Sequence, residues 1–366
     1  MNFKLILLTI LLVFSACGRN KTDQMLYIFE RHSALPVDMA RLKSVLVSNQ
    51  EEGLKKIDRY AGITSLGEAQ TVASLSSGER KGFGLNARLN GDEFCIESVP
   101  EGSPAFDAGI RPGDCILSIN NKTVKGLDPA GIFRLISDSG DVMETGLIRI
   151  TAGKENVFKA KLWKRLFSVP GFFVLNDKNI AYLRITQLYP GIGLEISRKG
   201  GYLNGKKLII DLRDTFGGSP KEIASVLGLF TGQGRVMFRT MSRHQGYTAE
   251  YYAGDNAVFP GMNIAVLVNG MTASGAEIIA ASLRENAGAK IIGTETFGMG
   301  GVQKTFRVDK KTGLRLTVCF MAPPSGENIE SRGLRPDKRI DARFGGDVWG
   351  RLPNDASYKE AVRLLK

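Results

Sequence analysis

Short apolar runs alternate with helical patterns in the second half of the chain. Residues 180–185, 207–212 and 264–268 are rich in β-branched and aliphatic side chains, which is the pattern of buried strands. Apolar residues then recur at helical spacing over 223–229 and 278–283. Strands that alternate with helices in this way predict an α/β core.

The first half of the chain carries weaker patterns. Residues 37–80 are polar with apolar positions at helical spacing, so we expect a helical arm there. Strand patterns at 116–120 and 147–150 flank a helical pattern near 129–137. A last helical pattern covers 356–365.

Composition narrows the classes of function. A chain of 366 residues with 43% hydrophobic residues is long enough for about two domains with real cores. Its formal net charge is +12, but the basic residues form short blocks without interleaved stacking aromatics, so we expect no nucleic-acid binding. His32 and His244 are the only histidines. A histidine-based zinc site is therefore not expected, and we predict no metal and no cofactor.

The first residues have the pattern of an export signal. Lys4 precedes an apolar run over 5–14, which is shorter than the about 20 residues that cross a bilayer but suits a signal peptide. Cys17 follows two small residues, and this ending resembles the lipidation box of bacterial lipoproteins, with Phe14 where leucine is usual. We expect residues 1–17 to direct export to the bacterial cell envelope and a lipid on Cys17 to anchor a periplasm-facing protein. Signal cleavage without a lipid is the alternative.

Three further cysteines lie in apolar stretches. They are Cys95, Cys115 and Cys319, and none forms a Cys-x-x-Cys pair. Buried, inert thiols are the simplest interpretation. The sequence does not decide whether Cys95 and Cys115 form a disulfide.

Ser274 lies where the strand pattern of 264–268 gives way to a helical pattern. Unpaired N–H groups at a helix N-terminus can bind an oxyanion, which suits a serine nucleophile. A serine at a helix start is also an ordinary N-cap. Position alone leaves both interpretations open and favours the cap.

The segments around this serine resemble the C-terminal processing peptidases, serine peptidases that carry a PDZ domain and use a Ser–Lys dyad. Residues 269–277 are similar to the serine box of that family, and 293–303 to its Thr-Phe-Gly-Lys-Gly-x-Val-Gln segment. The resemblance implies that Ser274 is the nucleophile and that Gln303 orients the lysine. It places the lysine at position 299, where this chain has Met299.

Met299 bears directly on catalysis. A serine hydroxyl is a weak nucleophile and needs a base within hydrogen-bond reach. A desolvated lysine can be that base, whereas a thioether cannot take a proton near neutral pH. Lys304 is the nearest lysine in sequence, but in a strand it would point to the face opposite Gln303. We therefore expect Ser–Lys catalysis to be impaired.

A second turn resembles the family's Asp-Leu-Arg-x-Asn-x-Gly-Gly segment. It follows the strand pattern of 207–212 and ends in Gly217 and Gly218, whose backbone amides can approach a substrate closely. The resemblance implies that these glycines form an oxyanion site with the Gly275 amide. Thr215 stands where asparagine is usual. A tight turn without any site would also need glycines.

Residues 81–153 resemble a PDZ domain. Gly82, Phe83, Gly84 and Leu85 are similar to its carboxylate-binding loop, and the resemblance implies capture of protein or peptide C-termini as an added strand. The same stretch fits the dinucleotide fingerprint G-x-G-x-x-A. Because no strand pattern precedes it, we exclude a dinucleotide site.

Together these features predict an α/β peptidase core at 154–366, an inserted PDZ domain at 81–153, and a linker with a helical arm at 18–80. One function that fits is a serine peptidase homologue acting on C-terminal or unfolded segments of exported proteins, with impaired catalysis. The alternative is a non-catalytic module that binds C-terminal peptides as a scaffold or adaptor. The sequence leaves the oligomeric state open.

Overall fold

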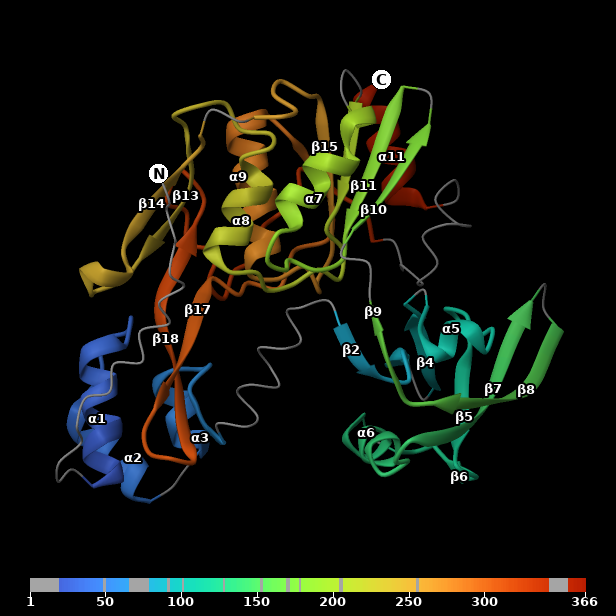
Figure 1. Ribbon diagram of the computed structural model, residues 1–366, viewed down its shortest axis with the longest axis horizontal. Coiled ribbons are helices and arrows are strands. Elements are labelled where there is room, and N and C mark those ends of the chain that lie inside the picture. Colours follow the sequence, from blue (N-terminus) through green and yellow to red (C-terminus); the bar gives the residue numbers. More distant parts are fainter. Residues whose placement is uncertain are drawn as a thin grey trace, which may run out of the picture. The chain divides into compact units, whose positions relative to one another are not determined.

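A computed structural model of the chain divides into two compact units (Figure 1). It describes residues 20–48, 51–65, 79–90, 93–100, 102–127, 129–151, 154–168, 172–177, 179–203, 207–254, 257–341 and 355–366. The predicted export signal and Cys17 lie outside these residues. In the part of the chain that is described, no helix is both long and apolar enough to cross a membrane.

The first unit comprises Met1–Ala69 and Gln303–Val318. Its helices are α1 (Lys21–His32), α2 (Met39–Val47) and α3 (Glu51–Ile57). They bury Phe29, Leu42 and Leu54, each worth about 1.5–3 kcal/mol relative to exposure. The buried Asp58 carboxylate accepts hydrogen bonds from the Thr317 backbone N–H at 2.7 Å and from its hydroxyl at 2.9 Å.

The predicted helical arm is partly wrong. Residues 62–65 form strand β1 (Gly62–Ser65), which pairs antiparallel with the start of β18 (Thr312–Ala322). The structure also has helix α1, which the sequence analysis did not predict. Strand β1 is short and polar, so its conformation follows from the partner strand and not from its own side-chain pattern.

A small β domain lies in the second unit, at the position predicted for the PDZ domain. Its sheet has the order β3-β4-β5-β7-β8, with β6 beside β5, and all these pairs are antiparallel. The elements are β3 (Asn86–Asn90), β4 (Glu93–Ser98), α5 (Pro104–Asp107), β5 (Cys115–Ile119), β6 (Lys122–Thr123), α6 (Pro129–Ser137), β7 (Val142–Thr151) and β8 (Lys154–Trp163). Cys95 and Cys115 form a disulfide, which settles the pairing that the sequence left open.

Strand β2 (Glu79–Gly82) precedes the glycine-rich loop and pairs antiparallel with β9 (Arg165–Ser168). The argument that no strand comes before this loop is therefore wrong. The dinucleotide interpretation still fails, because strand β3 follows the loop where the fingerprint needs a helix.

The α/β core of the second unit is built on a six-stranded sheet of order β10-β11-β12-β15-β16-β19. Strands β11 through β19 in this order run parallel, and β10 is antiparallel at one edge. The strands are β10 (Phe172–Asp177), β11 (Ile180–Ile185), β12 (Lys207–Asp211), β15 (Ile264–Val268), β16 (Lys290–Gly293) and β19 (Lys338–Arg339). The predicted fold class is confirmed.

Helices cover both faces of this sheet (Figure 1). Alternate strand residues point to opposite faces, so Leu208 and Ile210 pack with one helical layer while Ile209 packs with the other. The first layer contains α7 (Ile192–Lys199), α8 (Pro220–Leu227) and α9 (Gly275–Ala287), and the second contains α11 (Ala356–Leu365). Burial on both faces explains why β15 is apolar throughout and why β11 and β12 are mostly apolar, with the buried Arg184 and Asp211 as charged exceptions.

The remaining elements complete the description. The last residues of β18 pair antiparallel with β13 (Val236–Met241), which pairs with β14 (Ala249–Tyr252). Strand β17 (Gly301–Arg307) pairs with β18. Two short 3₁₀ turns cover Gly201–Leu203 and Gln245–Tyr247.

Candidate active site

Two loops meet at the carboxyl ends of β12 and β15. The Ala273 N–H donates to the Thr215 carbonyl at 3.0 Å, and the Gly275 N–H donates to the Gly217 carbonyl at 3.1 Å. Carboxyl ends of parallel strands are where open α/β sheets place their sites. The structure thus brings the two segments singled out in the sequence side by side, with Ser274 between the bonded residues.

Ser274 occupies the predicted strand-to-helix turn. Strand β15 ends at Val268 and helix α9 begins at Gly275. The Ser274 backbone has φ 59° and ψ −121°, and the residue is 8% exposed. A positive φ is uncommon for a residue with a side chain and is held only where the surroundings fix it.

Glu277 supplies much of that fixation. Its side chain is fully buried, and its Oε2 accepts the Ser274 N–H and the Met299 N–H, both at 2.9 Å. Its Oε1 accepts the Gly298 N–H at 2.9 Å and the Thr296 hydroxyl. One carboxylate therefore ties the backbone of the candidate nucleophile to the turn that carries Met299.

Glu277 was not among the residues predicted for the site, although its sequence context carried a signal. Ser274 and Glu277 have the Ser-x-x-Glu spacing of a capping box, in which the glutamate reaches back to the backbone N–H of the N-cap. That spacing could have predicted the bond from the Ser274 N–H. It carries no information on the three bonds from residues 296–299.

The predicted oxyanion glycines lie beside Ser274 in a defined arrangement. Gly217 and Gly218 have φ 80° and 92°, a conformation that favours glycine. A Cβ on Gly275 would lie 2.2 Å from the Gly217 carbonyl oxygen. The Gly275 N–H, which the resemblance assigns to an oxyanion, donates here to that carbonyl. An oxyanion would have to displace the Gly217 carbonyl to receive this N–H.

The remaining predicted catalytic residues lie after β16. Met299 is half-buried in the turn that Glu277 holds. Gln303 is half-buried in β17 and belongs to the first unit. Lys304 is exposed, and its Nζ lies 5.5 Å from the centre of the Phe306 ring.

Thr215, which stands where the family has asparagine, is fully buried. Its hydroxyl donates to the Ile185 carbonyl at the end of β11. The threonine therefore anchors the turn to the sheet. Its side chain is engaged inside the fold.

A buried ionic cluster supports the same turn. The fully buried Asp211 carboxylate accepts the Tyr182 hydroxyl at 2.6 Å and lies 3.2 Å from Arg184 Nη1. Arg213 bonds both Asp211 oxygens through Nε at 3.0 Å, and its Nη1 lies 2.6 Å from Asp355, the N-cap of α11. Burial opposes ionisation of Asp211, but the two guanidinium groups outweigh it and hold its pKa below the ordinary range. The cluster fixes where the turn leaves β12.

The predicted carboxylate loop lies between β2 and β3. Gly82 ends β2, Phe83 is buried, and the Phe83 carbonyl accepts the Ala105 N–H at 2.9 Å. Gly84 has φ 78°, and a Cβ there would lie 2.2 Å from the Ser103 Cβ. Leu85 is half-buried before β3, which is an end strand of its sheet. A strand at the end of a sheet is where a bound peptide can be added as a further strand.

Two parts of the chain match known protein families. Residues 179–340 match peptidase family S41, and residues 96–149 match the PDZ domain. Carboxyl-terminal-processing peptidase 2, chloroplastic, from Arabidopsis thaliana is 31% identical over an alignment of 311 residues that covers 79% of this chain and 59% of that protein. The carboxy-terminal processing protease CtpA of Bacillus subtilis is 27% identical over an alignment of 294 residues that covers 78% of this chain and 61% of that protein. The chain thus matches about three fifths of the length of these two relatives.

Solved structures show the same fold. A structure from Bacteroides fragilis assigned to the S41 proteases has a TM-score of 0.67 at 15% identity and covers 93% of this chain and 96% of its own. The photosystem II D1 C-terminal processing protease has a TM-score of 0.59 at 19% identity, covering 88% and 94%.

Proposed function

We propose that this chain, which belongs to the C-terminal processing serine peptidases of family S41 as its motifs predicted, acts on C-terminal or unfolded segments of exported proteins with impaired Ser–Lys catalysis. The observation that carries this proposal is Met299. Its backbone N–H shares the Glu277 carboxylate with the Ser274 N–H, which supports the assignment of residue 299 to the lysine position of the family, here without the amine.

Whether residue 299 can accept a proton decides the chemistry. Proton transfer by a positioned base contributes about 10²–10⁴-fold to rate, and methionine cannot provide it. Lys304, the nearest lysine in sequence, is exposed, and its Nζ lies over the Phe306 ring. The Ser274 hydroxyl therefore stays a weak nucleophile in this proposal.

A second candidate function is binding without any hydrolysis. The bond from the Gly275 N–H to the Gly217 carbonyl favours it, because an oxyanion site needs that donor free. In this case the PDZ domain and the former active site would hold a peptide C-terminus as a scaffold or adaptor. The two candidates differ in whether Ser274 reacts at all.

Wild-type protein should react only slowly with a fluorophosphonate probe, because an unactivated hydroxyl is a weak nucleophile. Slow labelling that Ser274→Ala removes would favour the first candidate, and labelling no faster than that of Ser274→Ala would favour the second. Gel fluorescence after labelling, with an active serine peptidase as positive control, is the measurement. Rapid labelling that Ser274→Ala removes would show that another group activates the serine, and would contradict impaired catalysis.

The PDZ loop should discriminate peptides by their last group. A peptide with a free C-terminal carboxylate should bind at least about tenfold more tightly than its amide, about 1.4 kcal/mol, because loop N–H groups stabilise the charge. Calorimetric titration with both peptides measures this difference. Equal affinities would exclude carboxylate capture.

A matched pair of glycine variants locates the effect. Gly84→Ala places a Cβ 2.2 Å from the Ser103 Cβ and should abolish the preference for the carboxylate. Gly126→Ala is the control, since Gly126 has a similar φ of 80° and its Cβ would meet nothing within 4 Å. An identical response of the two variants would point to a general loss of stability.

We also propose export and lipid anchoring at the bacterial cell envelope, on the pattern that ends at Cys17. One acyl chain gives only marginal membrane binding, so a stable anchor needs a multiply acylated N-terminus. Cys17→Ala should move the protein from the membrane fraction to the soluble fraction. Unchanged fractionation, with an N-terminal peptide that carries no lipid by mass spectrometry, would refute the anchor.

A further inference from the structure

The Cys95–Cys115 disulfide lies on the outer face of the PDZ sheet. The two cysteines are directly opposite each other in the β4–β5 register and are half-buried. Their neighbours Phe94, Ile96 and Ile116 are buried in the domain core. Because side chains alternate along a strand, the cysteines point to the other face. The disulfide is therefore open to solvent and to reagents on one side.

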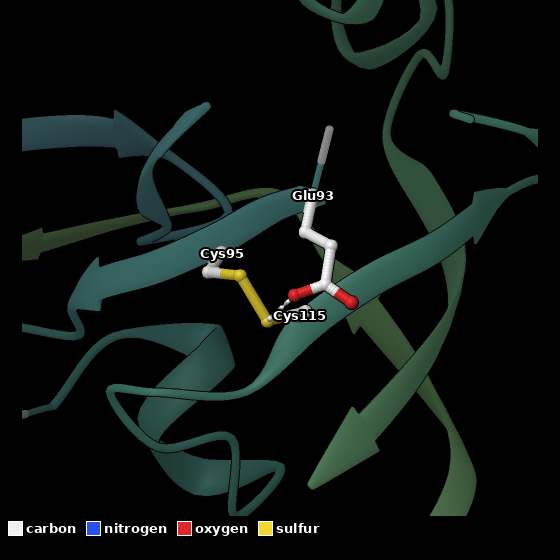
Figure 2. A group of neighbouring side chains, drawn as sticks. All are labelled: Glu93, Cys95 and Cys115. Atoms are coloured by element: carbon white, nitrogen blue, oxygen red, sulfur yellow. Dashed lines mark hydrogen bonds between the residues drawn. A yellow bond between two sulfur atoms is a disulfide. The ribbon is translucent and has the colours of Figure 1, made fainter. Parts of the chain in front are cut away.

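A carboxylate accompanies the two sulfurs. Glu93 precedes Cys95 by two positions, so it lies on the same face of β4. Glu93 Oε2 is 3.9 Å from Cys115 Sγ, and the three donor atoms all lie within 4.8 Å of one another (Figure 2). In the described part of the chain, no other three His, Cys, Asp or Glu side chains converge in this way.

Two thiolates and one carboxylate form a ligand set suited to zinc, whereas the sulfurs of a disulfide are not thiolate ligands. We propose that Glu93, Cys95 and Cys115 form a zinc site that opens when the disulfide is reduced, so that the PDZ domain carries either a covalent link or a bound cation. The site contains no histidine, which is why the histidine count could not predict it.

The chemistry balances with a dithiol reductant. Thiol–disulfide exchange transfers two electrons and two protons from the dithiol, breaks the Cys95–Cys115 bond and leaves the reductant as a disulfide. Zinc then displaces the two thiol protons and binds both sulfurs and one Glu93 oxygen. Water fills the fourth position of the tetrahedron, as in zinc sites with three protein ligands.

The backbone can hold both states. Tetrahedral zinc with Zn–S bonds of about 2.3 Å separates two sulfurs by roughly 3.8 Å. The Cα atoms of Cys95 and Cys115 are 3.9 Å apart, close to this separation of the sulfurs, so two side chains on the same face can hold one cation between them. Rotation of the two cysteine side chains is then enough to exchange the covalent link for the cation.

The test is a zinc titration of the full chain in the oxidised and the reduced state. Cys17→Ala and Cys319→Ala in the background leave only the two thiols in question. After reduction by a trialkylphosphine, Zn²⁺ in competition with a chromophoric chelator should bind at least about 100-fold more tightly than to the oxidised protein. Glu93→Gln should weaken binding by about tenfold or more, and Glu155→Gln, an exposed glutamate on β8, should leave it unchanged.

A second readout separates a folded site from loose thiols. Zn²⁺ should raise the thermal midpoint of the reduced protein, because a ligand that prefers the folded state stabilises it. Co²⁺ should give thiolate-to-metal charge-transfer absorption in the reduced protein and none in Cys95→Ser. Three results would each overturn the proposal and leave a structural disulfide only. They are equal zinc affinity of the oxidised and the reduced protein, zinc binding that persists in Cys95→Ser, and a thermal midpoint that zinc does not change.

Discussion

Replacing Met299 by lysine is expected to raise Ser274-dependent hydrolysis of an unfolded substrate by about 10² or more, because it restores a general base. Methionine and lysine have unbranched side chains of similar length, so the half-buried position should accept the change with a small packing cost. The backbone is already placed, since Glu277 holds the N–H groups of Met299 and Ser274 at 2.9 Å. Release of new C-termini from a labelled unfolded protein measures the rate.

Two controls make the Met299→Lys result specific. Adding Ser274→Ala should abolish the gain. Met271→Lys makes the same chemical change in the exposed turn before Ser274, away from the lysine position of the family, and should give no gain. A Met299→Lys protein that folds but stays inactive would contradict the missing base as the sole defect. The bond from the Gly275 N–H to the Gly217 carbonyl would then be the next cause to test.

The main strands were predictable because of where they lie. Residues 180–185 and 264–268 lie between two helical layers, so apart from Arg184 their side chains are apolar or aromatic and stand out between polar turns. The position of Ser274 was predictable for a related reason. The turn between a buried strand and the helix that follows it lies at the carboxyl end of the sheet, and Ser274 is in that turn. The structure has β11 and β15 at the predicted bounds.

Short edge strands were not predictable in the same way. Strands β1 and β2 contain few apolar residues, and each is defined by hydrogen bonds to a partner far away in sequence. Polar strands of four residues have no periodicity that separates them from a loop. Pairing with a distant strand decides their conformation, and the local sequence pattern carries no information about that pairing.

The hydrogen bonds of the site were also beyond the sequence. The Gly275 N–H donates to the Gly217 carbonyl because loops that follow two different strands lie side by side. Glycine has no side chain from which this hydrogen-bond partner could be predicted. The resemblance indicated which glycines gather near Ser274, but it could not give the direction of their peptide groups. Glu277 is an intermediate case, since only its bond to the Ser274 N–H follows from a local motif.

Glu277→Gln is expected to destabilise the second unit by about 3 kcal/mol or more. The fully buried carboxylate accepts from Ser274, Gly298 and Met299 N–H groups and from the Thr296 hydroxyl. Glutamine keeps one acceptor oxygen and turns an NH₂ donor toward groups that are themselves donors. Two bonds to a charged acceptor, each worth about 1.5–3 kcal/mol, are lost, and buried donors are left unpaired.

Thermal unfolding of Glu277→Gln beside Glu285→Gln measures this effect against a matched control. Glu285 lies on the same helix α9 and also accepts from a backbone N–H and a hydroxyl, those of Ser325, but it is exposed. Its loss should cost about 0.5 kcal/mol, as is usual for surface substitutions. Because Glu277 also sets the turn of residue 299, Glu277→Gln should remove the gain produced by Met299→Lys. A Glu277→Gln protein as stable as the control, or one that keeps this gain, would show that the carboxylate does not hold the two segments together.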